Sequence, residues 1–82
     1  DEDFLLESAS RLEADGGMPG ETPEERITAS LELLELLIVH GSTRAKGPFR
    51  HHVRRLLEFL QDSELSEAQA ERLARLGEMV EA

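Results

Sequence analysis

The chain has 82 residues and a formal net charge of −9 at pH 7, and it contains no Cys, Trp or Tyr. The lack of Cys excludes a disulfide framework, a thiolate nucleophile and a Cys-based zinc site, and the acidic charge argues against nucleic acid as the main partner. The apolar residues are almost all Leu, Ala, Ile and Val, without strand-like alternation, which predicts an all-α fold. We expect a single helical domain over residues 1–82, either a small four-helix bundle or two packed helical hairpins.

The chain begins at Asp1 rather than at Met, and no signal peptide is visible. We therefore expect a domain excised from a larger protein, and the sequence leaves its compartment open. The most apolar stretch, "LELLELLIV", is interrupted by two Glu and is too short to cross a bilayer. The sequence thus predicts no membrane span.

The first predicted helix covers about residues 2–14. Phe4, Leu5 and Leu12 recur at helical spacing, and the three acids that open the chain suit the positive end of a helix dipole. Gly16 and Gly17 predict its end, because Gly accepts the left-handed conformation that closes many helices.

The segment "ADGGMPGETPEE", residues 14–25, is interpreted as a corner between helices. In a calcium loop that began at Asp15, the third and fifth positions would be Gly17 and Pro19, which offer no side-chain oxygen. A phosphate loop needs Lys and a preceding strand, and this segment has neither. We therefore expect turn chemistry here rather than an ion site.

The second predicted helix, about residues 23–40, has the clearest start. Thr22, followed by Pro23 and then Glu25, predicts a capping box with Pro at the first helical position. The helix should end at Gly41. Its apolar stripe is broad, so we expect this helix at the centre of the packing. The stripe consists of Ile27, Leu31, Leu33, Leu34, Leu36, Leu37 and Ile38.

Two further helices are predicted over about residues 49–61 and 66–81. Phe49, Val53, Leu56 and Leu60 form the inward stripe of the third helix. The fourth begins at either Ser63 or Ser66, and we prefer Ser66 because Gln69 completes a capping box there. The stripe of the fourth helix can outrun the available core, which makes it the candidate surface for association with a partner or with a second copy. Its residues are Leu65, Leu73, Leu76 and Val80.

Charge is unevenly distributed along the chain. Residues 1–35 carry eleven acids and two bases, residues 36–55 carry five bases and no acid, and residues 56–82 carry seven acids and two bases. In the simpler interpretation, the five bases neutralise neighbouring carboxylates within the fold. In the alternative, an anion or an acidic peptide binds at the start of the third helix, where free backbone N–H groups add to the attraction. The bases are Arg44, Lys46, Arg50, Arg54 and Arg55, and the alternative assigns the contact to Arg44, Lys46, Arg50 and Arg54.

The sequence shows no constellation of reactive residues. His51 and His52 are adjacent, so on a helix they point about 100° apart and cannot both bind one metal ion. His40 suits a helix end, where it can donate to free carbonyls. We expect structural roles for these histidines, and a zinc site built from His40, His52 and a carboxylate is the remaining alternative. No Ser lies in a nucleophile elbow and no acid pair indicates a glycosidase, so we expect no catalytic residue, no cofactor and no metal site.

The order of the motifs resembles known helical proteins over roughly residues 4–60. "RLEADGGMPG", "ERITASLELLELLIVHGST" and "KGPFRHHVRRLLEFL" are similar to one repeat of an α/α-toroid of the prenyltransferase and squalene-cyclase kind. They also resemble the helical region near the C-terminus of bacterial proteins that combine a VIT domain with a von Willebrand factor A domain, and more weakly TerB-type helical domains. The cyclase aspartates have no counterpart here, so no catalytic residue carries over. The resemblance implies a packing unit within a larger bacterial protein.

These observations predict a non-catalytic helical module for protein–protein contact or for intramolecular packing in a multidomain protein. One alternative is an element that binds an anion or an acidic peptide through the basic residues 44–55. The other is a fragment of an α/α-toroid enzyme, whose activity would depend on repeats outside this chain.

Overall fold

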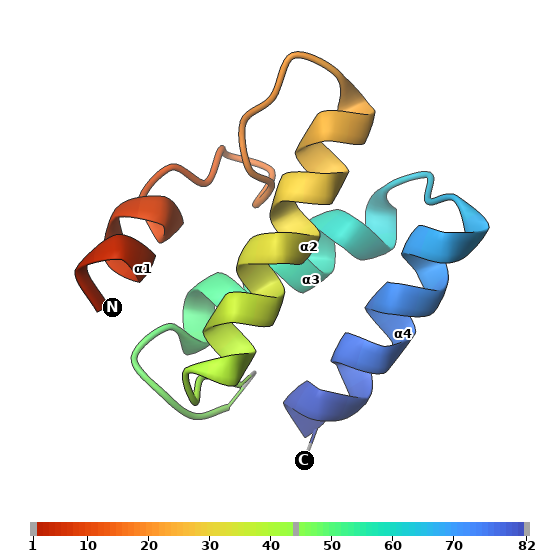
Figure 1. Ribbon diagram of the computed structural model, residues 1–82. Helices are drawn as coiled ribbons and strands as arrows, with labels where there is room; N and C mark the ends of the chain where they lie inside the picture. The colour runs from red at the N-terminus through yellow and green to blue at the C-terminus, as the bar shows by residue number, and fades with distance from the viewer. Residues whose placement is uncertain (1, 44, 82) are drawn as a thin grey trace.

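Four α-helices make up the part of the chain that the computed structural model describes, residues 2–43 and 45–81, and this part contains no strand (Figure 1). They are α1 (Glu2–Ala9), α2 (Pro23–Val39), α3 (Arg50–Asp62) and α4 (Glu67–Glu81). The predicted all-α class and the four-helix arrangement are confirmed. The last three helices begin and end within one residue of the predicted positions, whereas α1 ends five residues earlier than predicted.

Helix α1 is short because the chain after Ala9 finds other hydrogen bonds. The hydroxyl of Ser10 donates to the Glu7 carbonyl at 2.6 Å, which is the local competition through which Ser weakens helices. The N–H of Glu13 then donates to the Gly17 carbonyl at 2.8 Å and folds the chain back. Leu12 still packs against the core, but from a turn rather than from a helix.

The capping box predicted for α2 is present. Thr22 Oγ1 accepts from the Glu25 N–H at 3.1 Å, and Glu25 Oε2 accepts from the Thr22 N–H at 3.1 Å. Pro23 occupies the first helical position, and Gly41 closes the helix with φ 95°. Because both ends are fixed by local chemistry, the sequence was sufficient to place α2.

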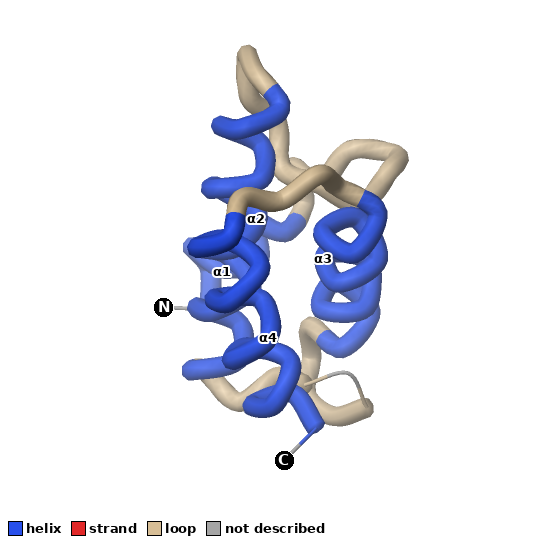
Figure 2. The backbone as a smooth tube through the Cα atoms, turned by 90° about the vertical axis from the view of Figure 1, so that its right-hand side faces the viewer, coloured by secondary structure: helices blue, strands red, loops and turns tan. Residues whose placement is uncertain are grey.

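Helix α2 lies at the centre and packs against the other three helices. In Figure 1, α1 and α4 flank it on opposite sides and α3 passes behind it, and Figure 2 shows α2 and α3 side by side as two layers. Leu34 and Leu37 of α2 are 0% exposed, as are Val53, Leu56 and Leu60 of α3. Burying one such side chain fully contributes about 1.5–3 kcal/mol, so this α2–α3 layer is the main source of stability.

The apolar stripe of α2 does not all face inward. Leu36 is 38% exposed and Val39 is 66% exposed, while Leu33 and Leu37 beside them are buried. The outer edge of the helix near its C-terminal end is therefore apolar and open. Among the described residues, we find no helix with the length and apolar character that a membrane span requires.

Candidate functional site

One guanidinium holds the corner between α1 and α2. Nη2 of Arg26, in the second turn of α2, lies 2.7 Å from Oδ1 of Asp15 and 2.8 Å from Oε1 of Glu13. Its Nε donates to the Met18 carbonyl at 3.0 Å. Hydrogen bonds to Asp15, from Arg26 first and then from the Gly17 N–H, hold the pKa of this carboxyl below its usual value. The positive charge of Arg26 is thus neutralised by two carboxylates of the corner.

The same corner is attached to the helices at two more points. The buried hydroxyl of Ser30 accepts from the Met18 N–H at 2.9 Å and donates to the Arg26 carbonyl at 2.7 Å. Across the molecule, Nη2 of Arg55 in α3 donates to the Glu13 carbonyl at 2.7 Å. The predicted corner is a turn in the structure, and side chains of α2 and α3 fix it to both helices.

Phe59 of α3 lies directly under this corner. The Arg26 guanidinium carbon is 4.9 Å from the centre of its ring, a cation–π contact. Gly17 lies at the ring edge, where a Cβ atom would come within 2.6 Å of the ring. Gly is therefore needed at position 17 because the backbone passes so close to Phe59. These contacts fix the position of the ring, which forms part of the floor of a groove.

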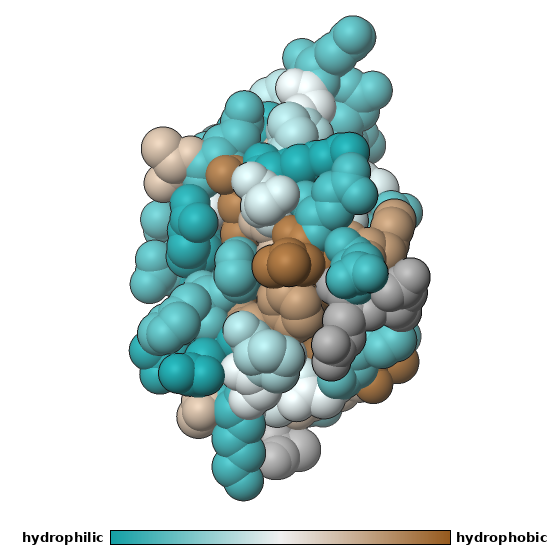
Figure 3. All heavy atoms as spheres, turned by 90° about the vertical axis from the view of Figure 1, so that its left-hand side faces the viewer, coloured by the Kyte–Doolittle hydropathy of each residue, from teal (hydrophilic) through white to brown (hydrophobic). Residues whose placement is uncertain are grey.

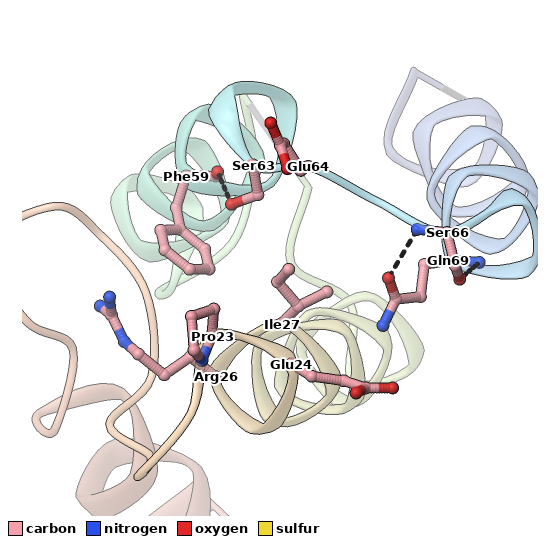
Figure 4. A pocket seen from close by; sticks show the side chains of 9 residues that line it. All are labelled: Pro23, Glu24, Arg26, Ile27, Phe59, Ser63, Glu64, Ser66 and Gln69. Atoms are coloured by element: carbon pink, nitrogen blue, oxygen red, sulfur yellow. Dashed lines mark hydrogen bonds between the residues drawn. The ribbon is translucent and has the colours of Figure 1, made fainter.

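The groove has a volume of about 600 Å³ and opens between the start of α2, the end of α3 and the first turn of α4 (Figure 4). Pro23, Ile27 and Phe59 point toward one another and form an apolar floor. Polar and charged side chains complete the lining: Glu24, Arg26, Ser63, Glu64, Ser66 and Gln69.

The wall formed by the α3–α4 turn is held in place by its own hydrogen bonds. Ser63 donates to the Phe59 carbonyl at 2.7 Å. Ser66 Oγ accepts from the Gln69 N–H at 3.2 Å, and Gln69 Oε1 accepts from the Ser66 N–H at 2.8 Å. This is the capping box predicted for the fourth helix, so the same residues that start α4 also fix one side of the groove.

The basic residues predicted to bind an anion lie on an exposed stretch. Lys46, Arg50 and Arg54 are exposed, and Arg44 falls outside the described residues. Arg50 begins α3 and donates to the Gly47 carbonyl at 3.2 Å. Arg55, like Arg50, donates to a backbone carbonyl. The simpler interpretation predicted that these bases would neutralise neighbouring carboxylates.

The apolar residues predicted as an association surface on α4 are used largely within the fold. Leu76 is 2% exposed and belongs to the core, while Leu65 and Leu73 are partly buried against it. Val80 has no described side chain. Leu76 is thus not accessible to a partner. Of the described side chains in the predicted association surface, only the partly buried Leu65 and Leu73 could still contact one.

The sequence did not predict which apolar side chains would be exposed. On α1, Phe4 is 57% exposed and Leu6 is 58% exposed, and Met79 of α4 is 44% exposed. Figure 3 shows apolar side chains gathered on the face where α1 lies. The predicted first helix treated Phe4 and Leu5 as one stripe, but successive helical residues point in different directions, and Leu5 takes the inward position.

The histidines do not gather at one site. His52 lies against Phe49, with 5.7 Å between ring centres, and its Nδ1 is buried without a hydrogen-bond partner among the described residues. Burial, followed by the charges of Arg55 and His51, lowers the pKa of His52. His40 is exposed at the C-terminal cap of α2. Within the described residues, no three His, Asp or Glu side chains are placed to hold a metal ion.

Comparison with known proteins does not assign the chain to a family. No family model, no curated protein and no solved structure matches the chain. The resemblances to toroid repeats and to VIT and von Willebrand factor A proteins therefore stay predictions.

Proposed function

We propose that the chain is a non-catalytic helical module that contacts another protein or another domain of the same protein. The observation that carries this proposal is the pair of exposed apolar side chains on α1. This eight-residue helix buries Leu5 and Ala9 against the core, while Phe4 and Leu6, one on each flank of Leu5, remain more than half exposed. The fold does not need large apolar side chains there, so they fit a contact surface.

Exposed apolar side chains near the C-terminal ends of α2 and α4 support the same role. Val39 and Leu36 lie one turn apart on α2, and Met79 lies near the end of α4. The C-terminal ends of these two helices are at the same end of the molecule (Figure 1). Burying apolar area of this kind against a partner contributes roughly 25 cal/mol per Å².

Sedimentation over a range of protein concentrations, combined with binding of a hydrophobic dye, tests this proposal. We expect concentration-dependent association or dye binding, and we expect the double variant Phe4→Ser, Leu6→Ser to reduce it several-fold. The free energy of unfolding of this variant should change by less than about 0.5 kcal/mol per site, as for other surface positions. A chain that stays monomeric throughout and binds no dye would contradict the proposal.

Binding of an anion or an acidic peptide is the second candidate. It is supported by the start of α3, where Phe49 provides no side-chain cap and the first turn contains no acid, so exposed Lys46 and Arg50 lie beside uncapped backbone. Titration with inorganic phosphate should then move the backbone amide signals of residues 45–51. Unchanged signals in that window would exclude this role.

A further inference from the structure

We propose that the groove between the start of α2 and the α3–α4 turn binds a basic segment of a partner protein, with an apolar side chain on the groove floor and Lys or Arg side chains at its rim. This inference rests on the proposed contact function and specifies the chemistry of the partner. The surface differs from the exposed face of α1, so the two can be tested separately.

The floor of the groove suits an apolar side chain or the aliphatic part of a long one. Pro23 and Phe59 present ring surfaces, and Ile27 between them is only 5% exposed. A volume of about 600 Å³ is within the range of sites that enclose small ligands, and it has room for one or two side chains. The surrounding hydrogen bonds fix the walls, so little ordering is needed when a ligand enters.

The groove carries a net negative charge because Arg26, the one cation among its described lining residues, is already paired. Arg26 is neutralised by Asp15 and Glu13, at 2.7 and 2.8 Å. Glu24 and Glu64, in contrast, are exposed and form no ion pair with any described residue. In Figure 4 their carboxylates lie outside the apolar floor, where the head of a Lys or Arg would reach them while its stem covers the floor.

The acidic surface continues along α2 beyond the groove. A second depression of about 390 Å³ lies beside it, and Glu24 lines both. Glu32 borders the far part of this second depression, whereas Glu25 has its carboxylate engaged in the capping box. A basic segment lying over Glu24 would therefore meet free carboxylates on either side, at Glu64 and at Glu32. Such a rim attracts cations during encounter and fixes their register on binding.

A second copy of this chain does not meet these requirements. Five of its nine bases lie in residues 44–55, but the apolar residues among them, Phe49 and Val53, are 6% and 0% exposed. Leu73 lies between Arg72 and Arg75, but it packs against the core, and Arg72 is paired with Glu35 at 3.7 Å. The ligand that fits is therefore a basic segment outside the residues described.

The test is an NMR titration of the isotope-labelled chain with a synthetic peptide that carries one leucine between two arginines. We expect the amide signals of residues 23–27 and 59–69 to shift. The double variant Glu24→Gln, Glu64→Gln should weaken binding about fivefold, the effect of two exposed charge pairs. The control double variant Glu58→Gln, Glu78→Gln removes the same charge from exposed positions outside the groove and should leave the affinity unchanged. Circular dichroism checks that all variants are folded.

Several results would overturn the inference. The amides near the groove could stay unmoved, or the control variant could weaken binding as much as the groove variant, which would indicate non-specific attraction to an acidic chain. A peptide with serine in place of leucine that binds equally well would show that the floor takes no part. Shifts confined to α1 would reject the groove as the binding site but would leave the proposed contact function intact. Only the sedimentation and dye-binding experiment on α1 can reject that function.

Discussion

At the scale of single residues, two glycines differ in the space that an added Cβ atom would have. A Cβ atom at Gly17 would lie 2.6 Å from the Phe59 ring, while one at Gly77 in α4 would meet nothing within 4 Å. Gly17→Ala should therefore lower the free energy of unfolding by about 1–3 kcal/mol, the usual cost of overpacking. Gly77→Ala, its matched control, should raise it by about 0.4–1 kcal/mol, because Ala favours the helix. Urea unfolding followed by circular dichroism measures both, and equal effects would contradict this assignment.

Asp15 gives the clearest pH dependence. Its pKa is lowered from 3.8, mainly by the hydrogen bond from Arg26. A carboxyl with a lowered folded pKa stabilises the fold above pH 3.8, and this contribution is lost as the pH falls through the folded pKa. An NMR titration should place the pKa of Asp15 below 3.8 in the natural chain and return it toward 3.8 in Arg26→Met. A carboxyl that titrates identically in both would exclude the Arg26 hydrogen bond as the cause.

His52 should destabilise the fold at mildly acidic pH. Its pKa is lowered from 6.5 by burial, with further contributions from Arg55 and His51, so the unfolded chain takes up its proton at a higher pH than the folded one. The free energy of unfolding should therefore decrease as the pH falls below 6.5, until the folded pKa is reached. The variant His52→Gln should flatten this part of the stability curve. A curve of the same slope in the variant would assign the effect to another group.

At the scale of elements, the capping box makes α2 sensitive to one hydroxyl. Thr22 Oγ1 is the acceptor for the Glu25 N–H, and Glu25 in turn caps the Thr22 and Glu21 N–H groups. Thr22→Ala should cost about 0.5–2 kcal/mol of stability. Thr28→Ala, an exposed position within the same helix, should be neutral or slightly stabilising. Thermal unfolding of the two variants distinguishes a cap from a general Thr effect.

The elements also show which features could be predicted from sequence. Both capping boxes, at Thr22 and at Ser66, were predicted because each depends on residues three positions apart. The end of α1 was not predicted. The chain leaves the helix at the Ser10 and Glu13 hydrogen bonds, and the turn that follows is fixed by Arg55, which donates to the Glu13 carbonyl from 42 residues away. A long-range contact of this kind leaves no local pattern.

The groove was missed for a similar reason. Its floor combines residues 23–27 with Phe59, and its far wall comes from residues 63–69. Arg26 was counted only as one of two bases in an acidic stretch, yet it organises the corner through Asp15 and Glu13, 11 and 13 residues earlier. Nothing in the spacing of these residues distinguishes them from a solvated helix edge.

At the scale of the whole molecule, the dimensions are those of a compact globule. The radius of gyration is 11.5 Å, and about 12 Å is expected for a compact chain of this length. Leu34, at 0% exposure, lies in the helix that packs against all three others, so its contacts stabilise the whole fold at once. We expect the isolated chain to unfold in a single cooperative transition, with the same midpoint by circular dichroism and by NMR.

The size of the molecule sets how severe a core substitution will be. A chain of this length is stable by roughly 4–12 kcal/mol, and Leu→Ala in a core typically costs about 2–5 kcal/mol. Leu34→Ala should therefore lose a large share of the stability of the chain and lower its urea midpoint strongly. Leu36→Ala, two residues away on the same helix but 38% exposed, should cost less than half as much. Equal losses would mean that α2 does not lie at the centre of the fold, and the groove and the corner, which both depend on its position, would then have no fixed geometry.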